Sequence, residues 1–150
     1  MPDAPLSRGN VRVKAAHKLA RRTSRAEARL FLADGPKSVE AALSREGCVT
    51  DVYASRSATD SFPELVAVAG QRWTVVEDAA IKLLSDSVNP AGLVAVCRFV
   101  DRPLAVTVTG ADLVAICADV RDPGNAGTVL RTCDAAGADA IVFAENSVDP

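Results

Sequence analysis

Short apolar segments alternate with helix-forming segments along most of this chain, and this alternation restricts the folds that it can adopt. Apolar runs rich in β-branched residues predict four strands, at residues 30–33, 49–54, 73–76 and 92–100. Helices bounded by proline and glycine are predicted between them, from Pro36 up to Gly47 and at residues 63–69 and 77–84. Strands that alternate with helices form layered domains, so we predict an α/β fold.

A smaller strand–helix–strand unit comes after a break in this rhythm at residues 101–111, which we interpret as a linker. It comprises predicted strands at residues 113–118 and 140–144, a turn at residues 119–127 and a helix at residues 128–136. Both strands are apolar throughout, which is typical of parallel strands covered on both faces. Two strands and one helix cannot bury their own apolar faces, so we expect residues 112–150 to be the truncated first part of a larger domain.

The N-terminal segment combines helix patterns with a strong excess of positive charge. Residues 1–10 predict a flexible tail, residues 11–22 a helix, and residues 24–27 have the spacing of a capping box at the start of a second one. From Arg8 to Arg29 there are eight basic residues and one acidic residue, a local charge of +7 in a chain of net charge −2. This segregation of charge predicts a polyanionic partner.

RNA is the polyanion that we expect, because so one-sided a run exceeds what a solvated helix face requires. Phe31 is the one aromatic residue near the run, so contacts with the phosphate backbone are expected rather than base stacking. The predicted RNA-binding residues are Arg12, Lys14, Lys18, Arg21, Arg22, Arg25 and Arg29.

The segment from Asp122 to Arg131 carries the strongest chemical signal. It lies between a predicted strand and a predicted helix, where α/β proteins place their ligands. Its two glycines allow close backbone approach, Asn125 supplies an amide, and Arg131 supplies a cation that points back towards the turn. The alternative interpretation is a well-formed turn without function, since Asp-Pro-Gly-Asn is favourable turn chemistry.

Residues 120–139, with the sequence VRDPGNAGTVLRTCDAAGAD, resemble the first motif of the SpoU (TrmH-like) branch of the SPOUT RNA methyltransferases. Residues 145–150 are similar to the segment after that motif in many members of the branch. Residues 29–36 and 84–96 resemble two signatures of the substrate-binding domain that precedes it. Asp34, Ala91 and Cys133 depart from the more usual residues without removing a group used in catalysis.

The resemblance implies an L30e-like α/β/α RNA substrate-binding domain at residues 11–100, and after it the first β-α-β unit of a SPOUT domain at residues 112–150. It implies transfer of a methyl group from S-adenosylmethionine to a ribose 2′-hydroxyl of ribosomal or transfer RNA, by a homodimer. Asn125 and Arg131 match the catalytic positions of the motif. The cofactor-binding residues are expected beyond Pro150, so the 150-residue chain alone should be inactive.

The chemistry of these two residues favours particular roles. A ribose hydroxyl is a poor nucleophile, so an enzyme must remove its proton or stabilise the developing alkoxide. A guanidinium group stays protonated in proteins and is poorly suited to act as a base. We therefore expect Arg131 to stabilise negative charge and hold a phosphate, with Asn125 fixing its orientation.

Two alternative functions remain open from the residues alone. The first is an RNA-binding module without catalytic activity. The second is a dinucleotide-binding oxidoreductase, because Gly124 and Gly127 precede a helix and Glu145 lies about 20 residues further on. A third glycine is missing from that motif, and the upstream domain has no explanation in such an enzyme.

Cysteine spacing and hydropathy point to a cytoplasmic protein without a metal site or membrane segment. The four cysteines form no C-x-x-C pair and lie in apolar runs, which predicts reduced side chains packed as small apolar groups. A zinc site would require ligands at short spacing. No run approaches the roughly 20 apolar residues that span a bilayer.

Overall fold

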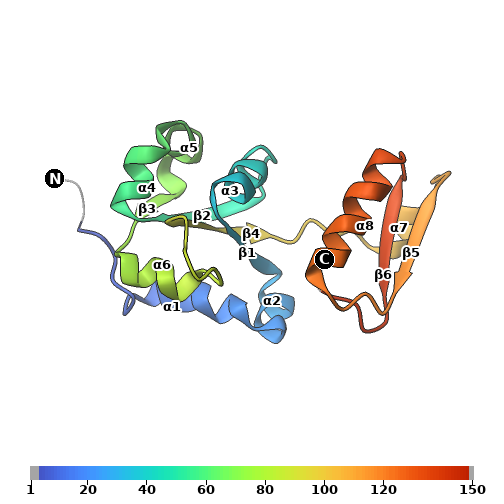
Figure 1. Cartoon of the computed structure of the whole chain (residues 1–150), viewed down its shortest axis with the longest axis horizontal. Coiled ribbons are helices and arrows are strands. Elements are labelled where there is room, and N and C mark those ends of the chain that lie inside the picture. The colour runs from blue at the N-terminus through green and yellow to red at the C-terminus, as the bar shows by residue number, and fades with distance from the viewer. Residues whose placement is uncertain (1–3, 149–150) are drawn as a thin grey trace. The chain divides into compact units, whose positions relative to one another are not determined.

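The computed structural model describes residues 4–148 and divides the chain into two compact units, residues 1–99 and residues 100–150 (Figure 1). Both units contain helices and strands, which confirms the predicted α/β class. No helix among the described residues is long and apolar enough to cross a membrane.

The first unit is built on a four-stranded sheet with the strand order β1-β4-β2-β3. β4 is antiparallel to both of its neighbours, whereas β2 and β3 are parallel. The strands are β1 (Leu30–Asp34), β2 (Val49–Ala54), β3 (Trp73–Val75) and β4 (Leu93–Arg98). All four strands predicted for this region are present.

Two layers of helices cover the sheet, one on each face (Figure 1). One layer consists of α3 (Pro36–Leu43), α4 (Arg56–Ser61) and α5 (Pro63–Ala69), the last continued by η2 (Gly70–Arg72). The other contains α1 (Val11–His17), η1 (Lys18–Ala20) and α6 (Asp78–Leu84), while α2 (Arg22–Ala28) leads into β1. The sequence pattern missed α4, which is only six residues long and begins where the Ser55 side chain caps the N–H of Ala58.

Strand β4 shows why the sheet needs both layers. Leu93, Ala95 and Cys97 are fully buried against α3, α4 and α5. Val94 and Val96 point to the other face and pack with residues of α1 and α6. Alternate residues of a strand face opposite sides, so an apolar run of this length can be buried only between two layers.

Two predictions about the N-terminal segment are wrong for its described residues. Residues 1–10 were expected to form a flexible tail, and the first three lie outside the described residues. Leu6, however, donates its N–H to Val75 O at 3.0 Å and accepts from Glu77 N at 3.0 Å. Its side chain also packs on the core beside α1, so apolar burial and two backbone hydrogen bonds hold this segment against the edge of β3.

The helix expected at residues 11–22 is broken rather than continuous. α1 passes into η1, and Arg21 is extended (φ −94°, ψ 130°) before α2 begins at Arg22. The predicted capping box is therefore wrong, because Ser24 lies inside α2 and does not cap it. Burial of Val13, Ala16 and Leu19 determines where α1 and η1 lie, and that requirement outweighs the local capping preference.

The second unit contains two parallel strands, β5 (Val114–Ala118) and β6 (Ala140–Ala144), joined by α8 (Pro123–Ala135). The short helix α7 (Leu104–Val108) lies within residues 101–111, which we had interpreted as a linker. Apolar side chains remain open to solvent here, with Ile116 72% and Val106 62% exposed. We expected this exposure, because two strands and one helix cannot bury all of their own apolar side chains.

Helix α8 begins five residues earlier than expected, at Pro123 rather than at Thr128. The Asp122 carboxylate accepts a hydrogen bond from the N–H of Asn125 at 2.7 Å, and Pro123 occupies the first helical position. Aspartate before proline is a strong helix-start signal as well as a turn signal. Residues 123–127, which we assigned to the predicted turn, therefore belong to α8.

Candidate active site and RNA-binding face

The candidate active site lies after the carboxyl ends of β5 and β6. Asp119 and Glu145 come directly after these two strands, and both have a left-handed backbone (φ 58°). Few residues other than glycine adopt this conformation, so each marks a sharp reversal of the chain. The two reversals bring the segment before α8 and the segment after β6 to the same edge of the sheet.

Ser147 ties these two segments together. Its side chain is 4% exposed, and its hydroxyl donates to Ala144 O at 2.7 Å while accepting from Val120 N at 3.1 Å. The N–H of Val148 also donates to Val120 O at 2.8 Å. The chain between β5 and α8 is thus anchored from the β6 side, a role that sequence reasoning did not assign to Ser147.

Asp139 fastens the opposite edge of the strand pair. Its carboxylate accepts from Leu113 N at 3.0 Å and Asp112 N at 2.9 Å. These two backbone hydrogen bonds lower the pKa of Asp139, because they stabilise the charged carboxylate. Both ends of this small sheet are therefore fixed by side-chain hydrogen bonds.

The guanidinium of Arg131 folds back along α8 towards the start of the helix. Its Nη2 donates to Thr128 Oγ1 at 3.2 Å, and the Thr128 hydroxyl donates in turn to Gly124 O at 2.9 Å. A methyl group placed on Gly127 would lie 3.2 Å from Arg131 Nη1, which is tighter than most real contacts. The predicted direction of Arg131 agrees with this geometry.

Asn125 and Arg131 do not meet as we expected. Both residues are exposed on α8. Six positions of an α-helix rotate a side chain by about 600°, so these residues lie roughly 120° apart around the axis. Within the described part of the chain the hydrogen-bond partner of Arg131 is Thr128, not Asn125. The side chain that contacts the Arg131 guanidinium is thus that of Thr128.

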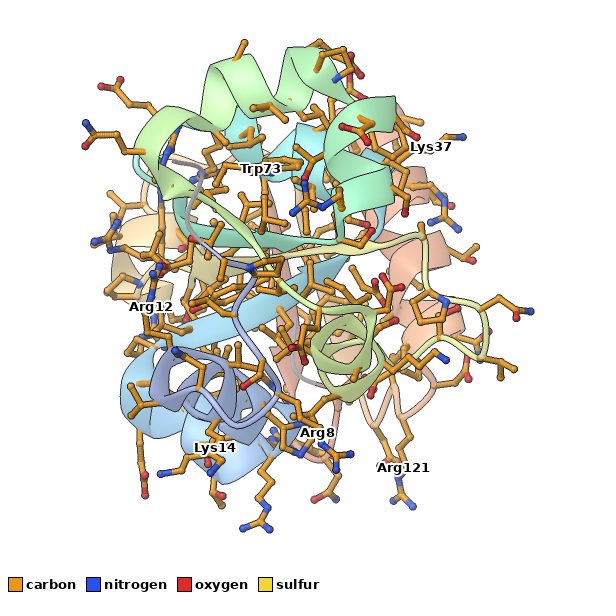
Figure 2. All side chains as sticks on the ribbon, turned by 90° about the vertical axis from the view of Figure 1, so that its left-hand side faces the viewer. Arg8, Arg12, Lys14, Lys37, Trp73 and Arg121 are labelled. Carbon is orange, nitrogen blue, oxygen red and sulfur yellow. The ribbon has the colours of Figure 1, made fainter. Side chains whose placement is uncertain are left out.

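The predicted RNA-binding residues fall into two groups, and the first is open to solvent. Lys14 and Lys18 are one helical turn apart, and Arg21 comes after them at the end of η1. All three are exposed, and their side chains make no hydrogen bond or ion pair with residues 4–148. In Figure 2, Lys14 and Arg8 extend away from the sheet. We call Lys14, Lys18 and Arg21 the open basic face.

The second group is engaged within the fold, beginning with Arg12. Its Nη2 donates to Asp51 Oδ1 at 2.6 Å and to Thr74 Oγ1 at 3.4 Å, and its guanidinium lies 5.8 Å from the centre of the Tyr53 ring. The hydrogen bond with Asp51 is the main reason that the pKa of Arg12 is raised. Figure 2 shows Arg12 beside the sheet rather than at the open basic face.

Other basic side chains also have structural contacts. Arg25 donates to Leu19 O at 3.0 Å and to Ala20 O at 3.1 Å, which caps the end of η1. Arg29 ends α2 with a left-handed backbone, and its guanidinium lies 4.5 Å from the centre of the Phe99 ring. Arg22 is the first residue of α2 and is exposed. The fold therefore separates the basic residues of this run into an open group and a group with contacts inside the protein.

The MRM3-like substrate-binding domain family matches residues 10–95, more than half of the chain. The chain belongs to this family. The matched region coincides closely with the three-layer first unit. This result confirms the resemblance to SpoU-type RNA methyltransferases that the sequence motifs indicated.

RNA methyltransferases of several organisms are similar to this MRM3-like chain. The 23S rRNA (guanosine(2553)-2'-O)-methyltransferase RlmP of Bacillus subtilis is 32% identical over 140 residues, which cover 93% of this chain and 54% of that protein. Mitochondrial rRNA methyltransferase 3A of Danio rerio is 40% identical over 74 residues, covering 46% of this chain and 17% of that protein. The chain thus spans about half the length of the bacterial relative.

Solved structures agree with both units of the MRM3-like chain. The crystal structure of an RNA 2′-O ribose methyltransferase is 32% identical with a TM-score of 0.73, covering 97% of this chain and 57% of that one. An rRNA methyltransferase from Sinorhizobium meliloti with bound AdoMet is 28% identical with a TM-score of 0.75, covering 97% and 55% respectively. The arrangement of strands and helices described above is that of known methyltransferases.

The geometry of α8 disfavours the dinucleotide-binding alternative. Gly124 and Gly127 lie within the helix rather than in a loop before it. The Asp122 carboxylate occupies the N–H of Asn125, a donor that would otherwise face a pyrophosphate. A phosphate-clamping loop between two helices, as in a KH domain, is equally absent at this position, because α8 comes directly after a strand.

Proposed function

We propose that this chain provides the RNA-binding domain and the first active-site elements of an S-adenosylmethionine-dependent RNA 2′-O-methyltransferase. Residues 11–100 would bind the RNA, and residues 112–150 would begin the methyltransferase domain. The observation that carries the proposal is the folded-back guanidinium of Arg131, held at 3.2 Å by Thr128 beside the carboxyl edge of a parallel strand pair. Ribosomal RNA is the substrate favoured by the names of the relatives.

Arg131 would act on the RNA rather than on the methyl donor. Its guanidinium can hold a phosphate through two parallel hydrogen bonds and stabilise negative charge that develops on the 2′-oxygen. Asn125 presents an amide from the first turn of α8, where it can bind the ribose or an adjacent phosphate. Both residues are exposed on the chain, as groups that meet a macromolecular substrate must be.

S-adenosylmethionine would supply the methyl group when bound. Arg131 and Asn125 carry no carboxylate suited to the sulfonium and ammonium charges of this cofactor, so they fit the RNA side of the reaction. We assign no residue of this chain to the cofactor. The 150-residue chain should therefore bind RNA without binding S-adenosylmethionine, which isothermal titration calorimetry can test directly.

The open basic face would provide the RNA affinity through its three cations. Lys14, Lys18 and Arg21 can contact successive phosphates, because lysines four residues apart project from the same side of a helix.

We also propose a homodimer formed through the second unit, whose exposed Ile116 and Val106 would be covered in the assembly. Cys48 and Cys97 are buried and form no disulfide in the structure, and this supports a cytoplasmic location, where thiols persist.

Substitution of Arg131 in the complete gene product tests the proposed function. Arg131→Ala should abolish methyl transfer to RNA and lower RNA affinity only slightly, because one phosphate contact is lost while the open basic face is intact. Arg131→Lys should also fail, since lysine retains the charge but not the paired hydrogen bonds. A complete protein that still methylates RNA with Arg131→Ala would refute this assignment.

A further inference from the structure

Three residues around Arg131 form a connected arrangement on the first two turns of α8. The Thr128 hydroxyl accepts from Arg131 Nη2 at 3.2 Å and donates to Gly124 O at 2.9 Å. Gly127 lies directly beneath the guanidinium, since a Cβ atom built there would be 3.2 Å from Arg131 Nη1. The guanidinium is thus linked to the start of the helix on one side and closely supported on the other.

The glycine at position 127 is not explained by backbone geometry. Its φ angle is not in the left-handed region, and it lies inside a regular helix of 13 residues. Glycine is the poorest helix former after proline, so alanine would be favoured here on helix propensity alone. The space that the missing Cβ leaves for Arg131 is a physical reason for glycine at this position.

The threonine at position 128 meets a similarly specific demand. Its hydroxyl must accept one hydrogen bond and donate another at the same time, which serine can also do and valine cannot. Valine has nearly the same shape but no hydroxyl, so Thr128→Val removes both hydrogen bonds with little change in side-chain shape.

We propose that Gly127 and Thr128 are positioning residues that hold the Arg131 guanidinium against the first turn of α8. This inference rests on the proposed function, because it assigns them their effect through Arg131. The residues need not touch the RNA. They would act by restricting an otherwise flexible arginine to the geometry in which it meets the reacting ribose.

Gly127→Ala provides the sharpest test, because it should lower activity without lowering stability. In the complete gene product kcat should fall by between about ten-fold and one-hundred-fold, the loss typical of a misplaced catalytic group. KM for RNA should stay unchanged, because the open basic face is untouched. The thermal midpoint should stay equal or rise, since alanine favours the helix.

Thr128→Val and Thr128→Ser form the matched pair. Thr128→Val should reduce kcat in the same range, and Thr128→Ser should restore it, because the hydroxyl returns. In the 150-residue chain, the ¹H–¹⁵N resonance of the Arg131 side chain should move towards that of a free arginine with Thr128→Val and return with Thr128→Ser.

The outcomes separate this inference from the proposed function. If Arg131→Ala is inactive while Gly127→Ala and Thr128→Val keep full kcat, the positioning role is wrong and the proposed function stands. If Gly127→Ala lowers both the thermal midpoint and kcat, glycine serves the fold and the inference is also wrong. An active Arg131→Ala protein would refute the proposed function and this inference with it.

Discussion

The division of the basic residues by the fold leads to a quantitative prediction about RNA binding. Lys14, Lys18 and Arg21 are exposed and make no side-chain hydrogen bond or ion pair with residues 4–148, whereas Arg12 pairs with Asp51 at 2.6 Å. The slope of the logarithm of the binding constant against the logarithm of the salt concentration reports how many phosphates a protein neutralises. If the three open cations each neutralise one phosphate, replacing all three with glutamine should reduce this slope by about 2.7 for duplex RNA and about 2.1 for single strands, with the coefficients per phosphate taken from DNA. Between about 50 and about 200 mM salt, the wild-type chain should then lose roughly 40-fold more duplex affinity than the variant.

Fluorescence anisotropy with a labelled hairpin RNA can measure these slopes, and Arg12→Gln is the matched control. The charge of Arg12 is already compensated by Asp51, so its removal should leave the slope near the wild-type value. The cost in stability should stay below about 1 kcal/mol, because the pair is partly exposed and screened by solvent. An unchanged slope in the triple variant, or an equal loss per charge with Arg12→Gln, would refute the reasoning.

Four further predictions concern the stability of the two units. Ser147→Ala should destabilise the second unit by about 0.5–1.5 kcal/mol, measured by urea denaturation, because it removes the acceptor of the partly buried Val120 N–H; no change would contradict the anchoring role. Amide hydrogens of residues 111–148 should exchange faster than those of residues 30–99, since apolar side chains there stay exposed; uniformly slow exchange in a monomer would show that the units fold together. Asp139 has a pKa below its ordinary value of 3.8, so its stabilising effect should be present above that pH and disappear as the pH falls through the lower folded value, a dependence that Asp139→Asn should remove. Burial raises the pKa of Cys97 to about 12, so this thiol should resist a thiol reagent at neutral pH until the first unit unfolds, and rapid native labelling would argue against that packing.

The sequence by itself determined the class of the fold and the position of the candidate site. Apolar runs with β-branched residues predicted the positions of the described strands, because a strand buried on both faces of a sheet has a nearly continuous apolar sequence. The motif at residues 120–139 located the candidate site through side chains that are unusual in combination. The exposed apolar residues of the second unit could be expected from counting strands and helices, without knowledge of their packing.

Only the tertiary structure decided which charges are open and which residues hold Arg131. The pairing of Arg12 with Asp51 crosses 39 positions of the chain, so no local pattern could reveal it. The start of α8 was ambiguous because Asp122 and Pro123 favour a turn and a helix start equally well, and only the hydrogen bond to Asn125 settled the choice. The direction of a long side chain depends on the space and partners beside it, and for Arg131 these are Gly127 and Thr128.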